Sequence, residues 1–196
     1  MLDRCVELLR DGRVLVCPTD TVYAYVCDSR NARAIEKLAK LKGVRLNKAD
    51  LSLLCSDLSD LSQYARQVAT PAFRVMKQSL PGPYTFILKA SGMIPSLFKN
   101  KKRTIGIRIP DDIVVSRLIE RLGHAIASTS VHSEDVQDYY SDPKELEKNK
   151  GHLVAAVIDA GSRGLVGSTV VDLSVDPPVI IREGAGSTCL LYTSPS

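Results

Sequence analysis

The chain has 196 residues, which is enough to bury one sizeable core in a single domain. Hydrophobic residues make up 44% of the chain and charged residues 24%, close to the averages of soluble globular domains, so the composition excludes a disordered or fibrous protein. The net charge of +4 suits an anionic partner without requiring one, and no apolar run reaches the ~18 residues that a membrane helix needs.

Helical spacing of apolar residues recurs along the chain. It predicts helices at residues 1–11 and 34–41. Further helices are expected at 58–68, from 70 onward and at 112–122, and a short charged helix is expected from 143 onward. Glycines typical of helix ends follow three of these segments, at Gly12, Gly43 and Gly123. Residues typical of helix starts precede three of them: Asp28, Ser29 or Asn31 for the second helix, Thr70 with Pro71 for the fourth, and Asp111 or Asp112 for the fifth.

Short runs rich in β-favouring residues alternate with these helices. They predict strands at residues 14–17, 22–27, 51–55, 84–90, 104–109, 125–128, 153–159, 169–173 and 179–182, with a polar loop at 129–142. Such alternation indicates an α/β domain, and we expect a mixed rather than purely parallel sheet. One domain should cover residues 1–186, because no repeat or linker interrupts it, whereas residues 187–196 have no periodic pattern and are expected to form a disordered or artefactual tail.

The five cysteines are an odd number with no C-x-x-C spacing, which argues against a disulfide framework and a zinc site. Cys17, Cys27 and Cys55 lie in apolar runs and are expected to be small core side chains. The three histidines are far apart and suggest no metal site. The sequence does not begin with the charged residues and apolar segment of an export signal. We therefore expect a cytoplasmic protein without a membrane partner.

Polar side chains collect at one strand end, where residues 14–17 run into Pro18-Thr19-Asp20-Thr21. Proline has no amide donor and ends the strand pairing, and ligands of open α/β sheets usually bind at strand ends. Thr19, Thr21 and Tyr23 are therefore candidates for contacting a small polar substrate. Alternatively, the threonines and the aspartate only satisfy the backbone of a turn.

Two groups of basic residues stand out. One consists of Lys99, Lys101, Lys102 and Arg103, and the other of Lys37, Lys40, Lys42, Arg45 and Lys48. Either group could be a solvated face, or part of a surface that contacts nucleotide phosphates or RNA. Only 5% of the residues are aromatic and tryptophan is absent, which argues against a stacking platform for single-stranded bases.

Four motifs occur in an order that resembles the YrdC family of threonylcarbamoyl-AMP synthases, and more closely its YciO-like branch. They are Pro-Thr-Asp-Thr-Val-Tyr from Pro18, Pro-Gly-Pro-Tyr-Thr-Phe-Ile-Leu from Pro81, Gly-Ile-Arg-Ile-Pro from Gly106, and Gly-Ser-Thr-Val-Val-Asp from Gly167. The resemblance covers residues 13–184. It implies a twisted mixed β-sheet flanked by helices, with a concave basic groove and one further strand before the first helix.

The resemblance also implies a reaction, in which L-threonine and bicarbonate give a carbamate whose oxygen displaces pyrophosphate from ATP. The product, threonylcarbamoyl-AMP, serves modification of a tRNA adenosine. Mg²⁺ would offset the charge of the triphosphate, and positioning by cationic and hydroxyl groups suffices without a nucleophilic side chain.

Several residues acquire roles through this resemblance. Thr21 and Tyr23 would line the threonine and nucleotide pocket, and Lys42 and Lys48 would face phosphates. Arg108 and Ser130 would hold the substrate or the nucleotide, and Ser168 and Arg182 would close the site. For Arg108 and Arg182, which end apolar strands, the residues themselves also allow ordinary salt bridges, and for Ser168 a turn cap.

Two positions depart from the family pattern. The family has a lysine-x-arginine signature, whereas here Val44 follows Lys42 and Gly43, and Arg45 is displaced by one residue. The family's serine-x-asparagine becomes Ser130-Val131-His132. Both departures are features of the YciO-like branch.

Two alternatives to the synthase follow from the same residues. A binding protein could use the concave basic surface, with Lys99, Lys101, Lys102 and Arg103, for double-stranded RNA or tRNA. An enzyme of related carbamoyl or nucleotide chemistry could use a different acceptor, with His132 reshaping the pocket.

Overall fold

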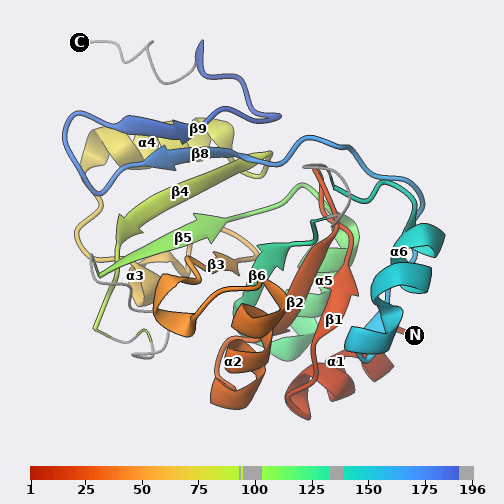
Figure 1. Cartoon of the computed structure of the whole chain (residues 1–196). Helices are drawn as coiled ribbons and strands as arrows, with labels where there is room; N and C mark the ends of the chain where they lie inside the picture. Colours follow the sequence, from red (N-terminus) through yellow and green to blue (C-terminus); the bar gives the residue numbers. More distant parts are fainter. Residues whose placement is uncertain (93, 95–102, 133–138, 190–196) are drawn as a thin grey trace.

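The computed structural model describes residues 1–92, 94, 103–132 and 139–189. These residues form a nine-stranded sheet in the order β7-β1-β2-β6-β3-β5-β4-β8-β9 (Figure 1). The strands are β1 (Leu15–Cys17), β2 (Ala24–Asp28), β3 (Ser52–Leu54), β4 (Tyr84–Lys89), β5 (Thr104–Arg108), β6 (Ile126–Ser130), β7 (Ala156–Val157), β8 (Thr169–Asp172) and β9 (Val179–Arg182).

The sheet is mixed, as the sequence predicts. β1 pairs in parallel with β7, β3 with β5, and β4 with β8, while the other neighbouring pairs are antiparallel. The described helices flank it: α1 (Leu2–Arg10), α2 (Ala32–Leu41), α3 (Leu61–Tyr64), α4 (Thr70–Ser79), α5 (Ile113–Leu122), α6 (Pro143–Lys150) and the 3-10 helices η1 (Leu46–Lys48) and η3 (Gly151–Leu153). Figure 1 shows α2 and α5 on opposite sides of β2.

Each face of the sheet packs an apolar core. The larger core joins α2, α3 and α4 to side chains such as Leu53, Phe86 and Ile107. The second core joins α1 and α5 to Leu54, Ile126 and neighbouring residues on the opposite face. Because successive strand residues point to opposite faces, neighbours such as Leu53 and Leu54 enter different cores.

Several local predictions are confirmed. Asn31 caps α2 by accepting from the Ala34 amide at 3.1 Å, and Asp112 caps α5 by accepting from two amides. Gly12, Gly43 and Gly123 have positive φ after α1, α2 and α5. Cys17, Cys27 and Cys55 are buried, and burial raises the pKa of each thiol.

Other predictions are wrong at element boundaries. The helix expected at 58–68 is confined to α3, because the Arg66 amide donates to the Lys89 carbonyl and Ala65 bridges Ala90 instead. Thr70 is the first residue of α4 and Ala69 is its N-cap. The strand expected at 153–159 shortens to β7, whose one neighbour among the described strands is β1.

Within the part of the chain that the structure describes, no helix is both long and apolar enough to span a membrane.

Candidate functional site

The sheet leaves part of one face uncovered, and this part carries short polar side chains. Ser128, Ser52, Gly106 and Ile87 are paired in a row across β6, β3, β5 and β4. Leu54 lies two positions from Ser52 on β3, and Ile126 lies two positions from Ser128 on β6, so both point to the same face of the sheet. These two residues pack in the core formed with α1 and α5. The helices therefore cover one end of these strands and leave the other end open.

A pocket of about 750 Å³ lies over this uncovered region. This volume falls within the usual range for small-molecule sites. Seven strands and the connection between α2 and β3 contribute its lining, which consists of Ala24, Lys42, Asn47, Lys48, Asp50, Leu51, Ser52, Thr85, Ile87, Thr104, Gly106, Arg108, Ser128, Thr129, Ser130, Ser168, Val170, Asp172, Ile181 and Arg182. Six of the predicted site residues are brought together here: Lys42, Lys48, Arg108, Ser130, Ser168 and Arg182.

Arg108 is the most enclosed cation of the pocket, with 5% of its surface exposed. Its Nη2 donates to Thr19 Oγ1 at 3.2 Å, to Thr21 Oγ1 at 2.7 Å and to Asp20 Oδ1, with which it forms a buried ion pair. Nε is buried and has no partner among the described residues. Burial lowers the pKa of the guanidinium, and Asp20 opposes that shift. Among the described residues, the hydrogen bonds of this side chain all come from one nitrogen, which fixes the side chain while it lines the pocket.

The Pro18–Thr21 turn reaches the pocket through Arg108. Thr19 and Thr21 are buried and do not line the pocket themselves. Thr19 Oγ1 donates to the Val22 carbonyl at 2.6 Å and accepts from the Thr21 amide at 3.2 Å, so it also shapes the turn. The hydroxyls therefore satisfy the turn, as the alternative interpretation expects, and they also hold a pocket cation, which neither interpretation predicted.

Tyr23 is fully buried and lies outside the pocket lining. Its hydroxyl donates to the Gly161 carbonyl at 2.8 Å and accepts from the Ala160 amide at 3.3 Å. Burial raises the pKa of this phenol. Tyr23 therefore fixes the connection that follows β7.

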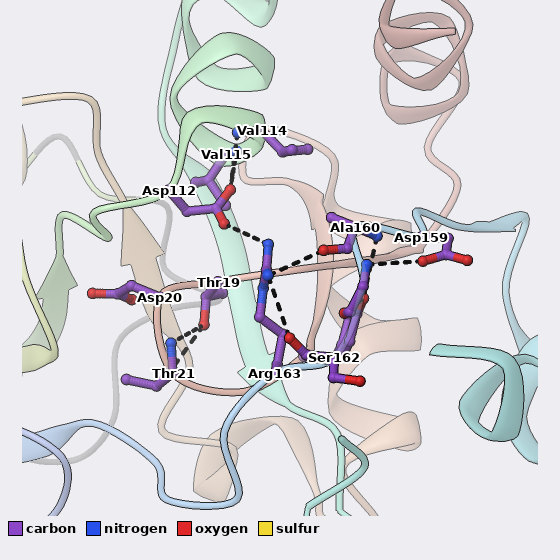
Figure 2. Close-up of polar contacts among 12 residues, drawn as sticks. Thr19, Asp20, Thr21, Asp112, Val114, Val115, Asp159, Ala160, Ser162 and Arg163 are labelled. Carbon is purple, nitrogen blue, oxygen red and sulfur yellow. Dashed lines mark hydrogen bonds and ion pairs between the residues drawn. The ribbon is translucent and has the colours of Figure 1, made fainter. Parts of the chain in front are cut away.

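An ion pair lies beside the turn, as Figure 2 shows. Arg163 donates to Asp112 Oδ2 at 3.1 Å and to the Ala160 carbonyl at 3.1 Å, while Asp112 Oδ1 caps α5. These contacts join the 159–163 connection to the start of α5. Figure 2 places Thr19 and Thr21 next to this pair, with Asp20 directed away from it.

Lys42 enters the pocket from the end of α2. Its ammonium donates to the carbonyls of Ala49 and Asp50, so it also closes the loop before β3. The pKa of Lys42 is lowered, mainly by burial. The charge of Asp50 opposes this decrease, and the charge of Arg182 adds to it. Lys48 lines the pocket from η1, whereas Arg45 is exposed outside the lining.

Ser168 and Arg182 form the wall contributed by β8 and β9. Arg182 Nη2 donates to the Ser168 carbonyl at 2.8 Å, and Thr85 Oγ1 and Ser168 Oγ share a hydrogen bond of 2.8 Å. The segment after β9 supports this wall, because the Gly184 amide donates to Thr169 Oγ1 at 3.0 Å. A Cβ on Gly184 would come within 2.3 Å of the Gly167 carbonyl oxygen, so the close approach requires glycine.

His132 lies near the pocket but outside its lining. Its ring packs on Tyr139 with 4.6 Å between the ring centroids. Burial is the largest cause that lowers the pKa of His132, and Arg182 and Lys42 act in the same direction. The neutral imidazole is therefore favoured.

Of the basic group proposed for RNA, Arg103 is exposed and has a positive φ of 52°, while Lys99, Lys101 and Lys102 lie outside the described residues.

Sequence reasoning missed several lining residues. Thr85 and Asp172 stand in quoted motifs, but nothing in the motifs distinguishes their roles. Asn47, Asp50 and Ile181 carried no signal, because only the folded loop and sheet bring them to the pocket. The described residues contain no cluster of three or more His, Cys, Asp or Glu suited to a metal ion.

Comparisons with known proteins agree with this fold. The model of the Sua5/YciO/YrdC family, described as telomere recombination, matches residues 7–184. The Escherichia coli YciO protein is 37% identical over 187 residues, covering 95% of this chain and 90% of that protein. Its crystal structure superposes with a TM-score of 0.91 at 36% identity, over 97% of this chain and 92% of that one.

Threonylcarbamoyl-AMP synthases are also similar. The synthase of Mus musculus is 32% identical over 191 residues, covering 93% of this chain and 66% of that protein. The crystal structure of Pyrococcus abyssi Sua5 in complex with L-threonine has a TM-score of 0.85 at 25% identity, over 93% of this chain and 54% of that one.

Proposed function

Since the chain belongs to the Sua5/YciO/YrdC family, we propose that it forms threonylcarbamoyl-AMP from L-threonine, bicarbonate and ATP, with release of pyrophosphate. The product would serve threonylcarbamoyladenosine modification of tRNA in the cytoplasm. Similarity to the named mouse synthase, and to a Sua5 structure that contains L-threonine, supports this reaction.

The observation that carries the proposal is the cationic pocket built around Arg108. Its guanidinium is held by Thr19, Asp20 and Thr21 in a nearly dry setting, where a charge interacts with a bound anion more strongly than in water. Lys42, Lys48 and Arg182 add three further cations. Such a pocket suits a polyanion together with a small polar substrate.

The reaction balances without a protein nucleophile. The threonine amine combines with bicarbonate to give a carbamate and water, and a carbamate oxygen then forms a bond to the α-phosphorus of ATP. The bond from that phosphorus to the bridging oxygen breaks, and pyrophosphate leaves with its electron pair. The protein needs to position the two anions and offset their repulsion.

Arg108 and Ser130 would hold the carbamate or its precursor, while Lys42, Lys48 and Arg182 would face the phosphates. Ser168 and Thr85 offer hydroxyls between these groups. Mg²⁺ commonly binds through one or two carboxylates together with substrate phosphates, and Asp50 and Asp172 line this pocket. The ion would therefore arrive with ATP and neutralise part of the triphosphate charge.

The test is pyrophosphate release from ATP and bicarbonate, with and without L-threonine. We expect threonine-dependent release from the unaltered chain and a loss of at least tenfold in Lys42→Ala. Lys37→Ala is the matched control, because Lys37 is an exposed lysine on α2. A folded protein that releases no pyrophosphate with threonine would contradict the proposal, and salt-dependent binding of double-stranded RNA by that protein would then favour the binding function.

A further inference from the structure

The two arginines of the pocket are held in different ways. Arg108 is almost fully buried and is fixed by the turn that follows β1, whereas Arg182 is exposed and is the last residue of β9. Among the described strands, β9 has one neighbour, β8. The end of an edge strand frays easily, and fraying would move the guanidinium away from a bound anion. Anion binding by Arg182 therefore requires a restraint beyond the pairing of β9 with β8.

Residues 184–187, here called the strap, supply such a restraint. The strap follows β9 closely and packs against the start of β4. The Tyr84 hydroxyl donates to the Ser187 carbonyl at 2.9 Å. A Cβ on Gly186 would lie 2.5 Å from a ring carbon of Tyr84, so the backbone of the strap lies directly against this ring.

One hydroxyl clamps the strap to β8. Thr169 is fully buried, and its Oγ1 accepts from the Gly184 amide at 3.0 Å and donates to the Gly186 carbonyl at 2.6 Å. The Ala185 amide, between these two residues, donates to the Gly167 carbonyl at 2.9 Å. Because the hydroxyl acts as donor and acceptor together, an apolar side chain of the same shape would leave two backbone groups of the strap without this partner.

The clamp lies next to the contact that orients Arg182. Nε and Nη2 of Arg182 donate to the Ser168 carbonyl at 3.2 Å and 2.8 Å. Ser168 directly precedes Thr169, and Arg182 lies two residues before Gly184. The Thr169 hydroxyl therefore restrains the chain on both sides of this contact.

We propose that Thr169 is a positioning residue for phosphate binding, because its hydroxyl clamps the strap and thereby keeps the Arg182 guanidinium at the wall of the pocket. The inference rests on the proposed function, in which Arg182 faces the phosphates of ATP. Thr169 does not line the pocket itself, so its effect passes through Arg182. A cation that is already positioned loses less conformational freedom on binding, and this raises affinity.

Isothermal titration calorimetry with ATP and Mg²⁺, without threonine or bicarbonate, tests the proposal. Thr169→Val keeps the shape of the side chain and removes its hydroxyl, and we expect ATP affinity to fall about fivefold. Arg182→Ala should lower it by at least about tenfold, since charge-assisted hydrogen bonds are lost. Thr169→Ser keeps the hydroxyl and should retain ATP affinity. A separate titration with L-threonine should give the same affinity for all four proteins, because threonine is placed against Arg108 and Ser130.

Combining Thr169→Val with Arg182→Ala separates positioning from a merely structural role. Once the guanidinium is absent, loss of the clamp should have no further effect, so the double variant should bind ATP as weakly as Arg182→Ala alone. Ser29→Ala is the control for stability. It removes another buried hydroxyl, which donates to the Ala125 carbonyl at 2.6 Å outside the pocket lining. This variant should lower the free energy of unfolding and leave ATP affinity unchanged.

Tyr84→Phe decides the question if Thr169→Val does not fold. It removes one bond to the strap, and the carbonyl of the exposed Ser187 can bind water instead. We expect ATP affinity to fall about twofold. Unchanged ATP affinity in Tyr84→Phe would then mean that the strap does not position Arg182.

The other failures are distinguishable. Equal losses in Thr169→Val and Thr169→Ser, a further loss in the double variant, or an equal loss of threonine binding would overturn the positioning role and leave the synthase proposal standing. An unaltered, folded chain that binds no ATP would overturn both.

Discussion

The two ends of β3 and β6 carry opposite kinds of side chain on one face of the sheet. Where α1 and α5 cover the strands, the residues are Leu54 and Ile126, and two positions away in the pocket they are Ser52 and Ser128. An apolar residue is stabilising where a helix removes it from water, whereas a hydroxyl keeps the uncovered surface hydrated and able to bind. The boundary between core and site therefore runs across individual strands.

Arg108 lies close to this boundary and, among the described cations that line the pocket, is the one that is almost fully buried. Its buried ion pair with Asp20 joins this pocket residue to the turn that follows β1. The buried part of the molecule therefore orients the pocket cation. Substitutions in the covered part of the sheet should mainly lower stability, whereas substitutions in the open part should mainly weaken binding.

The largest effect should come from Asp20→Ala. It leaves the Arg108 guanidinium buried without its counter-charge, and we expect the free energy of unfolding to fall by about 3–5 kcal/mol. Urea denaturation measures this loss. Asp3→Ala is the control: it removes an exposed ion pair with Arg121, and should cost at most about 1 kcal/mol. Similar costs for both variants would contradict the importance of burial.

Leu54→Ala and Ser52→Ala sharpen the comparison within one strand. The first should lower the free energy of unfolding by about 2–5 kcal/mol, because it leaves a cavity beneath α5. The second should change stability by no more than about 0.5 kcal/mol but weaken ATP binding, because Ser52 lines the pocket. Denaturation measures the stability of both variants, and calorimetry on the same samples measures their ATP affinity. A stability loss in Ser52→Ala together with a binding loss in Leu54→Ala would contradict the proposed boundary between core and site.

Gly106→Ala tests how closely the pocket floor is packed. A Cβ at this position would lie 2.8 Å from Ser52 Oγ and 3.3 Å from a methyl carbon of Thr85. We expect a loss of about 1 kcal/mol in the free energy of unfolding, the low end for overpacking, because the serine side chain can turn away. Adding Ser52→Ala should recover most of the loss, and failure to do so would place the strain in the backbone.

The smallest effect should be a change in pH dependence at Lys42. Burial lowers the pKa of its ammonium, so the cation is present below that pKa and disappears as the pH rises through it. Binding of ATP should then weaken severalfold at a pH below the usual lysine range. Lys42→Arg should keep its charge and move the decline to higher pH, which calorimetry at a series of pH values can follow. An identical profile in both proteins would exclude Lys42 as the titrating group.

Local patterns predicted most of the fold. Asn31, Asp112 and Gly123 marked helix ends because capping depends on only a few neighbouring residues. The prediction failed at 58–68, where a helix was expected but the Arg66 amide donates to the Lys89 carbonyl instead. Contacts between distant segments override local propensity in such cases.

The sequence by itself determined the alternation of strands and helices and the core cysteines, because side-chain type and spacing suffice for these, whereas the cationic residues of the pocket were assigned through the resemblance to the family. Only the tertiary structure decided that Thr19 and Thr21 act through Arg108, that Tyr23 fixes a distant connection, and that Asp172 faces the pocket. The physical reason is that these roles depend on which segments approach one another, and strand pairing across the sheet sets that approach.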